Sequence, residues 1–208
     1  KKAPAAAVRR VIVSGLLADV IRDEQGRVNL QELLPEAKEP VPPEQQFQGT
    51  VEIEDSEILY TDYTEMFGGP PLTVALTDVA ATADLRRPGY LRGEVSANAD
   101  AGKFNHLEAQ FGFNQGGPGF VLRADLASLN LAWAQRRFWP QREVRIFAGT
   151  ANASASVYQP PREDAQAGFT IRTSLNGVRG TFPGTGGAPV TVSGTAVVTP
   201  QGVTDADI

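Results

Sequence analysis

The sequence predicts an all-β fold, and three observations carry that prediction. Apolar and polar residues alternate along most of the chain, which gives each strand one apolar and one polar face. The 21 glycines and 15 prolines suit many turns better than long helices. About a dozen segments are separated mostly by turn signals, as in all-β domains. Apolar residues make up 41 % of the chain, enough for a large apolar surface.

The chain divides into three parts by composition. Residues 1–34 form an N-terminal strand-hairpin unit, in which residues 8–22 predict a strand kinked at Gly15, followed by a turn at 23–26, a short strand at 27–30 and a helical turn at 31–34. Residues 35–46 form an acidic, Pro-rich linker that is expected to be extended. Residues 47–208 hold the main β-sheet.

The clearest hairpin is predicted at the start of this sheet. Residues 47–54 and 57–63 form two alternating segments on either side of Asp55-Ser56. If these two residues form the turn, Ile53 pairs with Ile58 and Val51 with Tyr60, all on one face. Further strands are predicted at 72–78, 79–85, 90–99, 104–114, 119–125, 143–158, 168–175 and 189–199.

One short helix is predicted near residues 126–139. Leu126, Leu129 and Trp133 follow a roughly helical spacing, Ser128 is suited to an N-cap, and Pro140 ends the run. Arg136 and Arg137 would then lie on a solvated helix face, with contact to lipid headgroups as the alternative.

The residues needed for ordinary catalysis are missing from the sequence. The chain has no cysteine and one histidine, His106, which falls on the polar side of an alternating strand. Asp55, Glu57 and Asp62 suit a solvated acidic turn better than a calcium loop. We therefore expect no enzyme, no catalytic residues, no cofactor and no metal site. A carbohydrate-acting enzyme would need paired carboxylates in a cleft, whereas the acidic residues here fall mainly in turns and on polar faces.

The charge balance also excludes a class of partner. The formal net charge is −5, whereas nucleic-acid binding requires a basic surface that neutralises phosphates. We therefore expect no nucleic-acid partner.

The alternating strands leave an apolar face that one short helix is too small to cover. Two arrangements solve this problem. The sheet closes into a sandwich or barrel with an ordinary core, or it bends into an open trough whose apolar interior is covered by a ligand or partner. A bare apolar surface of many hundreds of Å² is rare in water without such an occupant.

Residues 11–34 resemble a recurrent signature of AsmA-like and TamB-like bacterial envelope proteins. The signature is an alternating strand, a turn, and an Asn-Leu pair followed by two leucines, here Arg22-Asp23, Gly26, Asn29-Leu30 and Leu33-Leu34. Residues 47–63, with the acidic Asp62 near the end of the second strand, resemble the hairpin that follows. Residues 120–149 resemble a third element, a strand with a short Leu-rich helix ending in proline and a strand entering Gly149.

The resemblance favours the open trough. It implies an elongated, strongly curved antiparallel β-sheet, taco-like in shape, that holds phospholipid or other acyl-chain lipids. Such proteins are placed in the periplasm, between the inner and outer membranes, where they carry lipid or assist outer-membrane assembly. The chain would then be a fragment of a longer, membrane-anchored protein with its anchor elsewhere, and other envelope proteins are possible partners.

Alternation along the strands identifies the side chains that would line this trough. They are Val51, Ile53, Ile58, Tyr60, Val74, Leu76, Val95, Leu107, Phe111, Phe113, Phe120 and Leu122. The alternative is a structural or protein-binding β module of the cell envelope, in which the same residues form a closed core. A register error of one residue would move a whole strand to the other face.

Overall fold

The computed structural model describes residues 8–29, 47–64, 71–99, 102–114, 119–138, 143–160 and 167–207. They form one sheet and one helix, with the bounds β1 Arg10–Ser14, β2 Leu17–Arg22, β3 Thr50–Asp62, β4 Leu72–Arg87, β5 Tyr90–Ala99, β6 His106–Asn114, β7 Phe120–Asn130, α1 Leu131–Phe138, β8 Arg145–Gln159, β9 Gly168–Thr181, β10 Val190–Thr199 and β11 Gly202–Asp207. The predicted helical turn at 31–34 and the linker at 35–46 lie outside the described residues.

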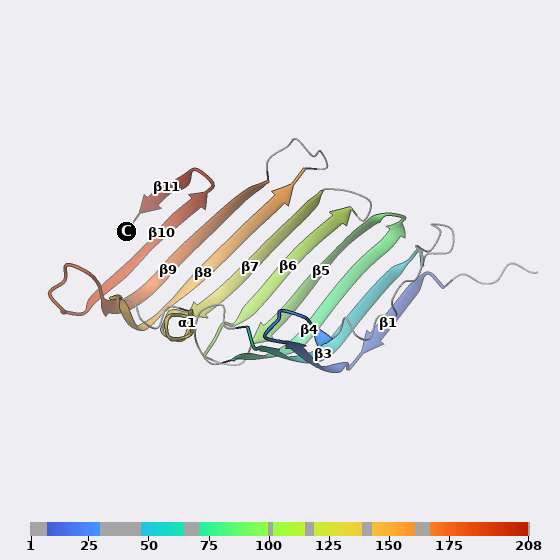
Figure 1. Ribbon diagram of the computed structural model, residues 1–208, viewed down its shortest axis with the longest axis horizontal. Helices are drawn as coiled ribbons and strands as arrows, with labels where there is room; N and C mark the ends of the chain where they lie inside the picture. The colour runs from blue at the N-terminus through green and yellow to red at the C-terminus, as the bar shows by residue number, and fades with distance from the viewer. Residues whose placement is uncertain are drawn as a thin grey trace, which may run out of the picture.

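The strands lie side by side in nearly their sequence order, in a single layer (Figure 1). Every pair from β3 to β11 is antiparallel, so the all-β prediction with one short helix is confirmed. The exception is at the N-terminal edge, where β1 and β2 both run parallel to β3. Residues 8–22 therefore form two strands, separated at Gly15, whose φ of 69° is one that favours glycine.

The predicted hairpin at Asp55-Ser56 is wrong. Residues 50–62 form the single strand β3, in which Ile53 pairs with Ala81 and Ile58 pairs with Leu76. Asp55 has a φ of 49° and shifts the register by one residue, as in a β-bulge. The bulge returns Ile58 to the same face as Ile53, which is the same outcome that a two-residue turn would give.

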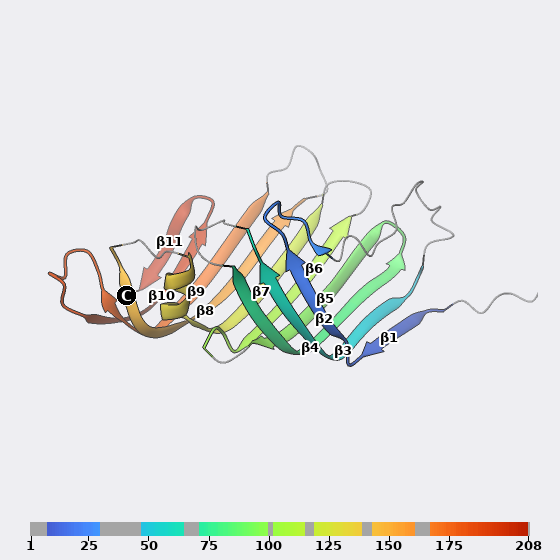
Figure 2. The same cartoon turned by 60° about the horizontal axis from the view of Figure 1, so that its bottom comes forward.

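A second bulge, at Asp78, joins the predicted strands 72–78 and 79–85 into β4. The bulges of β3 and β4 lie side by side, because Ser56 pairs with Val79. The break at Gly15 lies beside them, since Gly15 N–H donates to Glu54 O at 3.1 Å. Together these irregularities bend the sheet at one level, and the strand segments beyond them turn out of its plane (Figure 2).

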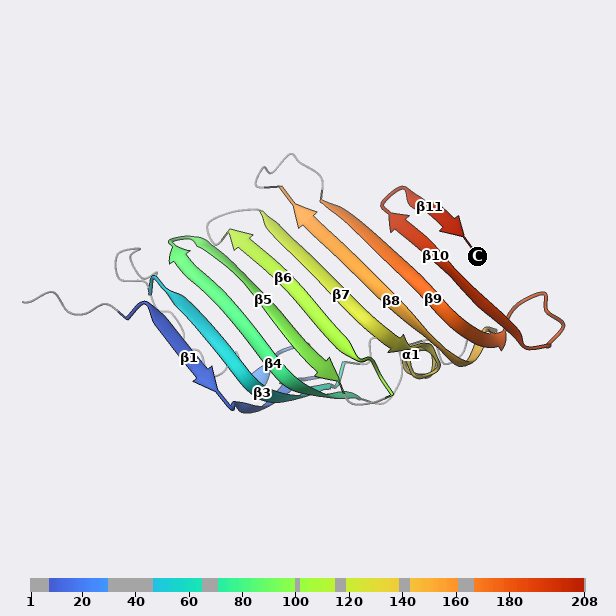
Figure 3. The same ribbon diagram turned by 180° about the vertical axis from the view of Figure 1, so that it is seen from behind.

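The segments beyond the bend are β2, residues 57–62 of β3 and residues 72–77 of β4, which we call the lip. Side chains at the bend are the most buried of the sheet: Ser56 is 0 % exposed, and Val79 and Ala97 are each 2 % exposed. By register all three lie on the same face as Ile53, so the lip bends toward the apolar side. Seen from behind, the opposite face is left uncovered by any element that the structure describes (Figure 3).

The helix begins later than the sequence predicts. Residues 126–130 continue β7, and Asn130, not Ser128, caps α1 by accepting a 3.0 Å bond from the Trp133 N–H. Ser128 instead has a φ of 56° in a bulge that places both Leu126 and Leu129 opposite alanines of β8. The leucine spacing that predicted a helix is produced here by a bulged strand.

The start of β8 is tied to α1 through one buried side chain. Gln135 donates to Val144 O and accepts from the Ile146 N–H, both at 2.8 Å. Figure 2 shows α1 on the same side of the sheet as the lip. The helix therefore covers one part of the side toward which the lip bends, and most of that side of the sheet stays open.

Candidate apolar binding face

The strand registers bring apolar side chains into continuous rows across the sheet. One row runs through Val51, Ala83, Gly93, Phe111, Leu122, Val157 and Phe169, from β3 to β9. The next row runs through Ile53, Ala81, Val95, Ala109, Ala124, Ala155, Ile171 and Val198. Directly paired residues on adjacent strands share a face, so both rows lie on the same side of the sheet. We call this side the apolar face.

All twelve side chains selected from the sequence lie on the apolar face. Besides the two rows, Ile58 and Tyr60 of β3 pair with Leu76 and Val74 of β4 on the lip. Leu107 of β6 pairs with Leu126 of β7, and Phe113 pairs with Phe120. The structure therefore joins the twelve into one surface, which extends from the flat part of the sheet onto the lip.

This surface lacks the burial of a closed core. Within the described residues, the buried apolar side chains are three valines and four alanines, with no leucine, isoleucine or phenylalanine among them. Leu122 is 39 % exposed, and Phe113 is 43 % exposed. Larger apolar side chains would be the first to be enclosed in a sandwich, so the apolar face is an open surface.

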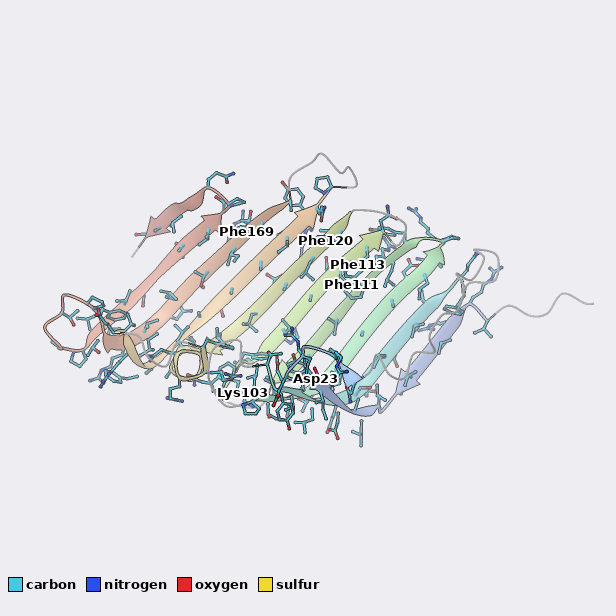
Figure 4. The ribbon with its side chains drawn as sticks, in the orientation of Figure 1. Asp23, Lys103, Phe111, Phe113, Phe120 and Phe169 are labelled. Atoms are coloured by element: carbon cyan, nitrogen blue, oxygen red, sulfur yellow. The ribbon has the colours of Figure 1, made fainter. Side chains whose placement is uncertain are left out.

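The phenylalanines give the apolar face its widest contacts. Phe111 and Phe113 of β6, Phe120 of β7 and Phe169 of β9 lie over the flat part of the sheet (Figure 4), and the ring centroids of Phe111 and Phe113 are 5.6 Å apart. Gly93 makes room for one of them, because a Cβ atom there would lie 2.7 Å from Cζ of Phe111. The glycine thus leaves space for an aromatic ring from the neighbouring strand.

The apolar face ends at a cluster of polar residues around Asp62, at the end of the lip. Tyr60 donates a 3.0 Å bond to Oδ2 of Asp62, and Arg22 lies 3.5 Å from the same oxygen. Thr64 donates two further bonds to Oδ1. Burial raises the pKa of Asp62, but the bonds from Thr64 and Tyr60 and the Arg22 charge outweigh it and lower the pKa overall. Burial and the neighbouring carboxylate raise the pKa of Tyr60.

The opposite side of the sheet is charged, and we call it the polar face. Asp84 accepts bonds from Arg86 at 2.9 Å and 2.6 Å and from Arg92 at 3.2 Å, and the Arg86 bonds hold its pKa well below the usual range. An open hollow of about 530 Å³ lies between such side chains, mainly Thr82, Asp84, Arg92, Glu94, Gln110 and Arg123. Its walls are mostly polar and charged side chains on a solvated surface, with Tyr90, Phe111 and Val121 among them, so we attribute no binding role to it.

The single histidine lies on the polar face as predicted. His106 is exposed, and its Nδ1 is 2.9 Å from Oδ1 of Asn98, whose amide donates to Asp78. Within the part of the chain that the structure describes, no group of three or more acidic or histidine side chains is arranged to hold a metal ion. No described helix has the length and apolar character needed to cross a bilayer.

Comparison with known proteins adds no relative. No family model, curated protein or solved structure matches this chain.

Several signature residues at the N-terminus have clear structural roles, whereas Leu30, Leu33 and Leu34 lie outside the described residues. Asp23 accepts bonds from the backbone and side chain of Arg27, both at 2.8 Å, and Gly26 has a φ of 81° in the same turn. Asn29 bonds the backbone of β2 twice, through Ile21 N–H and Asp19 O. The motif folds a turn back along β2 and satisfies backbone groups at its outer edge.

Two features on this side of the sheet were not predicted from the sequence. Alanines supply much of the floor, chiefly Ala81, Ala83, Ala109, Ala124, Ala153 and Ala155. Their alternation was the available signal, but alanine is too common on both faces to stand out. The second is the burial of Arg137, which is 9 % exposed, whereas a solvated helix face was expected, with contact to lipid headgroups as the alternative.

Proposed function

We propose that this chain is a segment of an AsmA-like or TamB-like envelope protein that holds lipid acyl chains on its apolar face. The observation that carries the proposal is the open, continuous apolar face, which has no covering layer in the described part of the chain. Its backbone polar groups are bonded within the sheet, so acyl chains would meet only side chains. The signature in residues 11–34 supports the family and, with it, a periplasmic location.

The dimensions of the apolar face suit an acyl chain. Strands β5 to β7 have 9 to 11 residues, which corresponds to about 30–37 Å of floor. A bilayer leaflet has a hydrocarbon thickness of about 15 Å. A chain of about 15 methylenes that covers half of its surface would gain about 6 kcal/mol, and a two-chain lipid about 12 kcal/mol before ordering costs. Such binding needs no polar recognition on the floor.

A uniform floor also suits movement. No polar group interrupts the central rows from Val51 to Phe169, so an acyl chain would meet similar surroundings at each strand. Transport of phospholipid between the inner and outer membranes, or delivery for outer-membrane assembly, would then require no catalysis by this segment. Other envelope proteins would connect this segment to the inner and outer membranes.

Native mass spectrometry of the purified chain tests the proposal. The expected result is retention of one or more phospholipids of the expression host, which are released as the protein unfolds. Lipid-free protein from several mild detergents, with unchanged stability when lipid is added, would contradict it.

The exposed edge strand β1 favours a second candidate, a protein-binding module. All five of its residues are exposed, including Val11, Ile12 and Val13. An open edge of this kind can accept a strand from another protein. The same mass spectra separate the candidates, because this module would retain a defined protein and no lipid.

A further inference from the structure

Arg136 and Arg137 are neighbours in sequence but differ in environment. Arg136 is exposed, whereas Arg137 is 9 % exposed and lies in the last turn of α1. Its guanidinium carbon is 5.9 Å from the centre of the Phe138 ring. The sequence expectation of a solvated pair is therefore wrong for Arg137, because the turn of the helix points this side chain into the protein.

The guanidinium of Arg137 lacks a counter-charge among the described residues. Its Nε and Nη1 atoms are both buried, and neither has a hydrogen-bond partner. None of the ion pairs in the described part of the chain includes it. A buried, unpaired cation is costly, and the ring and the helix C-terminus offset only part of that cost. The guanidinium therefore has N–H donors left for an anionic partner that the described residues do not supply.

The position of α1 relates this cation to the apolar face. The helix lies against β8, on the side of the sheet that also carries the lip (Figure 2). Ala132 and Ala134 of the helix are buried, as is Ala151 on the apolar face of β8. An acyl chain on the floor beside α1 would therefore lie on the same side of the sheet as Arg137.

We propose that Arg137 binds the phosphate group of a phospholipid whose acyl chains lie on the apolar face. The proposal rests on the proposed lipid function and deepens it by naming the headgroup chemistry. Guanidinium matches phosphate through paired N–H donors, which a lysine ammonium does not reproduce. The floor supplies affinity for any acyl chain, and Arg137 supplies preference for those that carry phosphate.

The test compares phosphatidylglycerol with diacylglycerol of the same acyl chains, both offered to the purified chain in mild detergent. Wild type is expected to prefer phosphatidylglycerol, and Arg137→Gln is expected to lose about tenfold of that preference with diacylglycerol uptake unchanged. Arg136→Gln, the matched control, is expected to retain it. Arg137→Lys is expected to retain part of it and stands in if the glutamine variant does not fold. An equal lipid preference in wild type and both Arg137 variants would overturn the proposal.

A second measurement separates this site from the lipid function as a whole. Inorganic phosphate is expected to raise the unfolding temperature of lipid-free wild type and Arg136→Gln more than that of Arg137→Gln. If wild type binds neither lipid, the lipid function fails, and this phosphate effect alone decides whether Arg137 is an anion site. No difference between the variants in phosphate would overturn the anion site as well.

Discussion

Phe111→Asp combined with Leu122→Asp is expected to lower lipid occupancy at least tenfold while the sheet stays folded. The two residues are direct partners on β6 and β7, in the middle of the apolar row that runs from Val51 to Phe169. Two carboxylates there would have to lose water whenever an acyl chain covers them, which costs more than the methylene contacts return. Because Leu122 is already 39 % exposed, its replacement should cost the fold only about 1–2 kcal/mol.

The matched control is Gln110→Asp combined with Val121→Asp. These residues are the sequence neighbours of the first pair on the same strands, but they lie on the polar face. Both double variants add the same charge to the same part of the sheet. Native mass spectrometry of bound lipid and urea unfolding of each variant check the prediction. If the Phe111→Asp, Leu122→Asp variant loses more than about 5 kcal/mol of its free energy of unfolding, these residues instead belong to a closed core.

Ser56→Ala is expected to destabilise the chain by about 1–3 kcal/mol, a large effect for the loss of one oxygen atom. Ser56 is 0 % exposed and lies where β3 bends into the lip. Its hydroxyl accepts a 3.0 Å bond from the Leu16 N–H and donates a 2.8 Å bond to Glu54 O, so it joins the connection between β1 and β2 to the bulge of β3. Alanine would leave the Leu16 amide without this partner.

The control for Ser56 is Ser156→Ala on β8, a half-buried serine on the polar face. Its replacement should change the free energy of unfolding by less than about 0.5 kcal/mol. Urea unfolding measures both variants, and proteolysis within residues 57–62 reports whether the lip loosens first. Equal stabilities of the two variants would show that Ser56 does not support the bend.

The composition of each face could be predicted from the sequence, because alternation survives any choice of strand partners. The pairings could not, and the reason is the same at each error. Asp55, Asp78 and Ser128 have positive φ and shift the alternation by one residue. In sequence such a shift resembles a tight turn, as at Asp55-Ser56, or a helical spacing, as at Leu126 and Leu129.

The bend of the sheet depends on the bulges at Asp55 and Asp78, so its place along the strands could not be predicted from the sequence either. The sequence did suggest that one helix could not cover the sheet, and the resemblance favoured a curved trough over a closed core. Nothing in the pattern marked where the sheet bends, because a positive φ at aspartate or serine leaves no periodic signal. The burial of Arg137 could not be predicted for a related reason. Two adjacent arginines are expected to be exposed to solvent, and without the exact helix bounds the sequence does not show which of them faces the sheet.

Photo-crosslinking at adjacent positions of β7 tests most directly whether lipid occupies the apolar face. Leu122 lies on the apolar face and Val121 on the polar face of the same strand, and they are similarly exposed at 39 % and 36 %. A benzophenone side chain at position 122, irradiated in the presence of phospholipid, is expected to yield phospholipid adducts, while the same group at position 121 yields none. Equal lipid labelling at both positions, or protein adducts alone at position 122, would contradict the account.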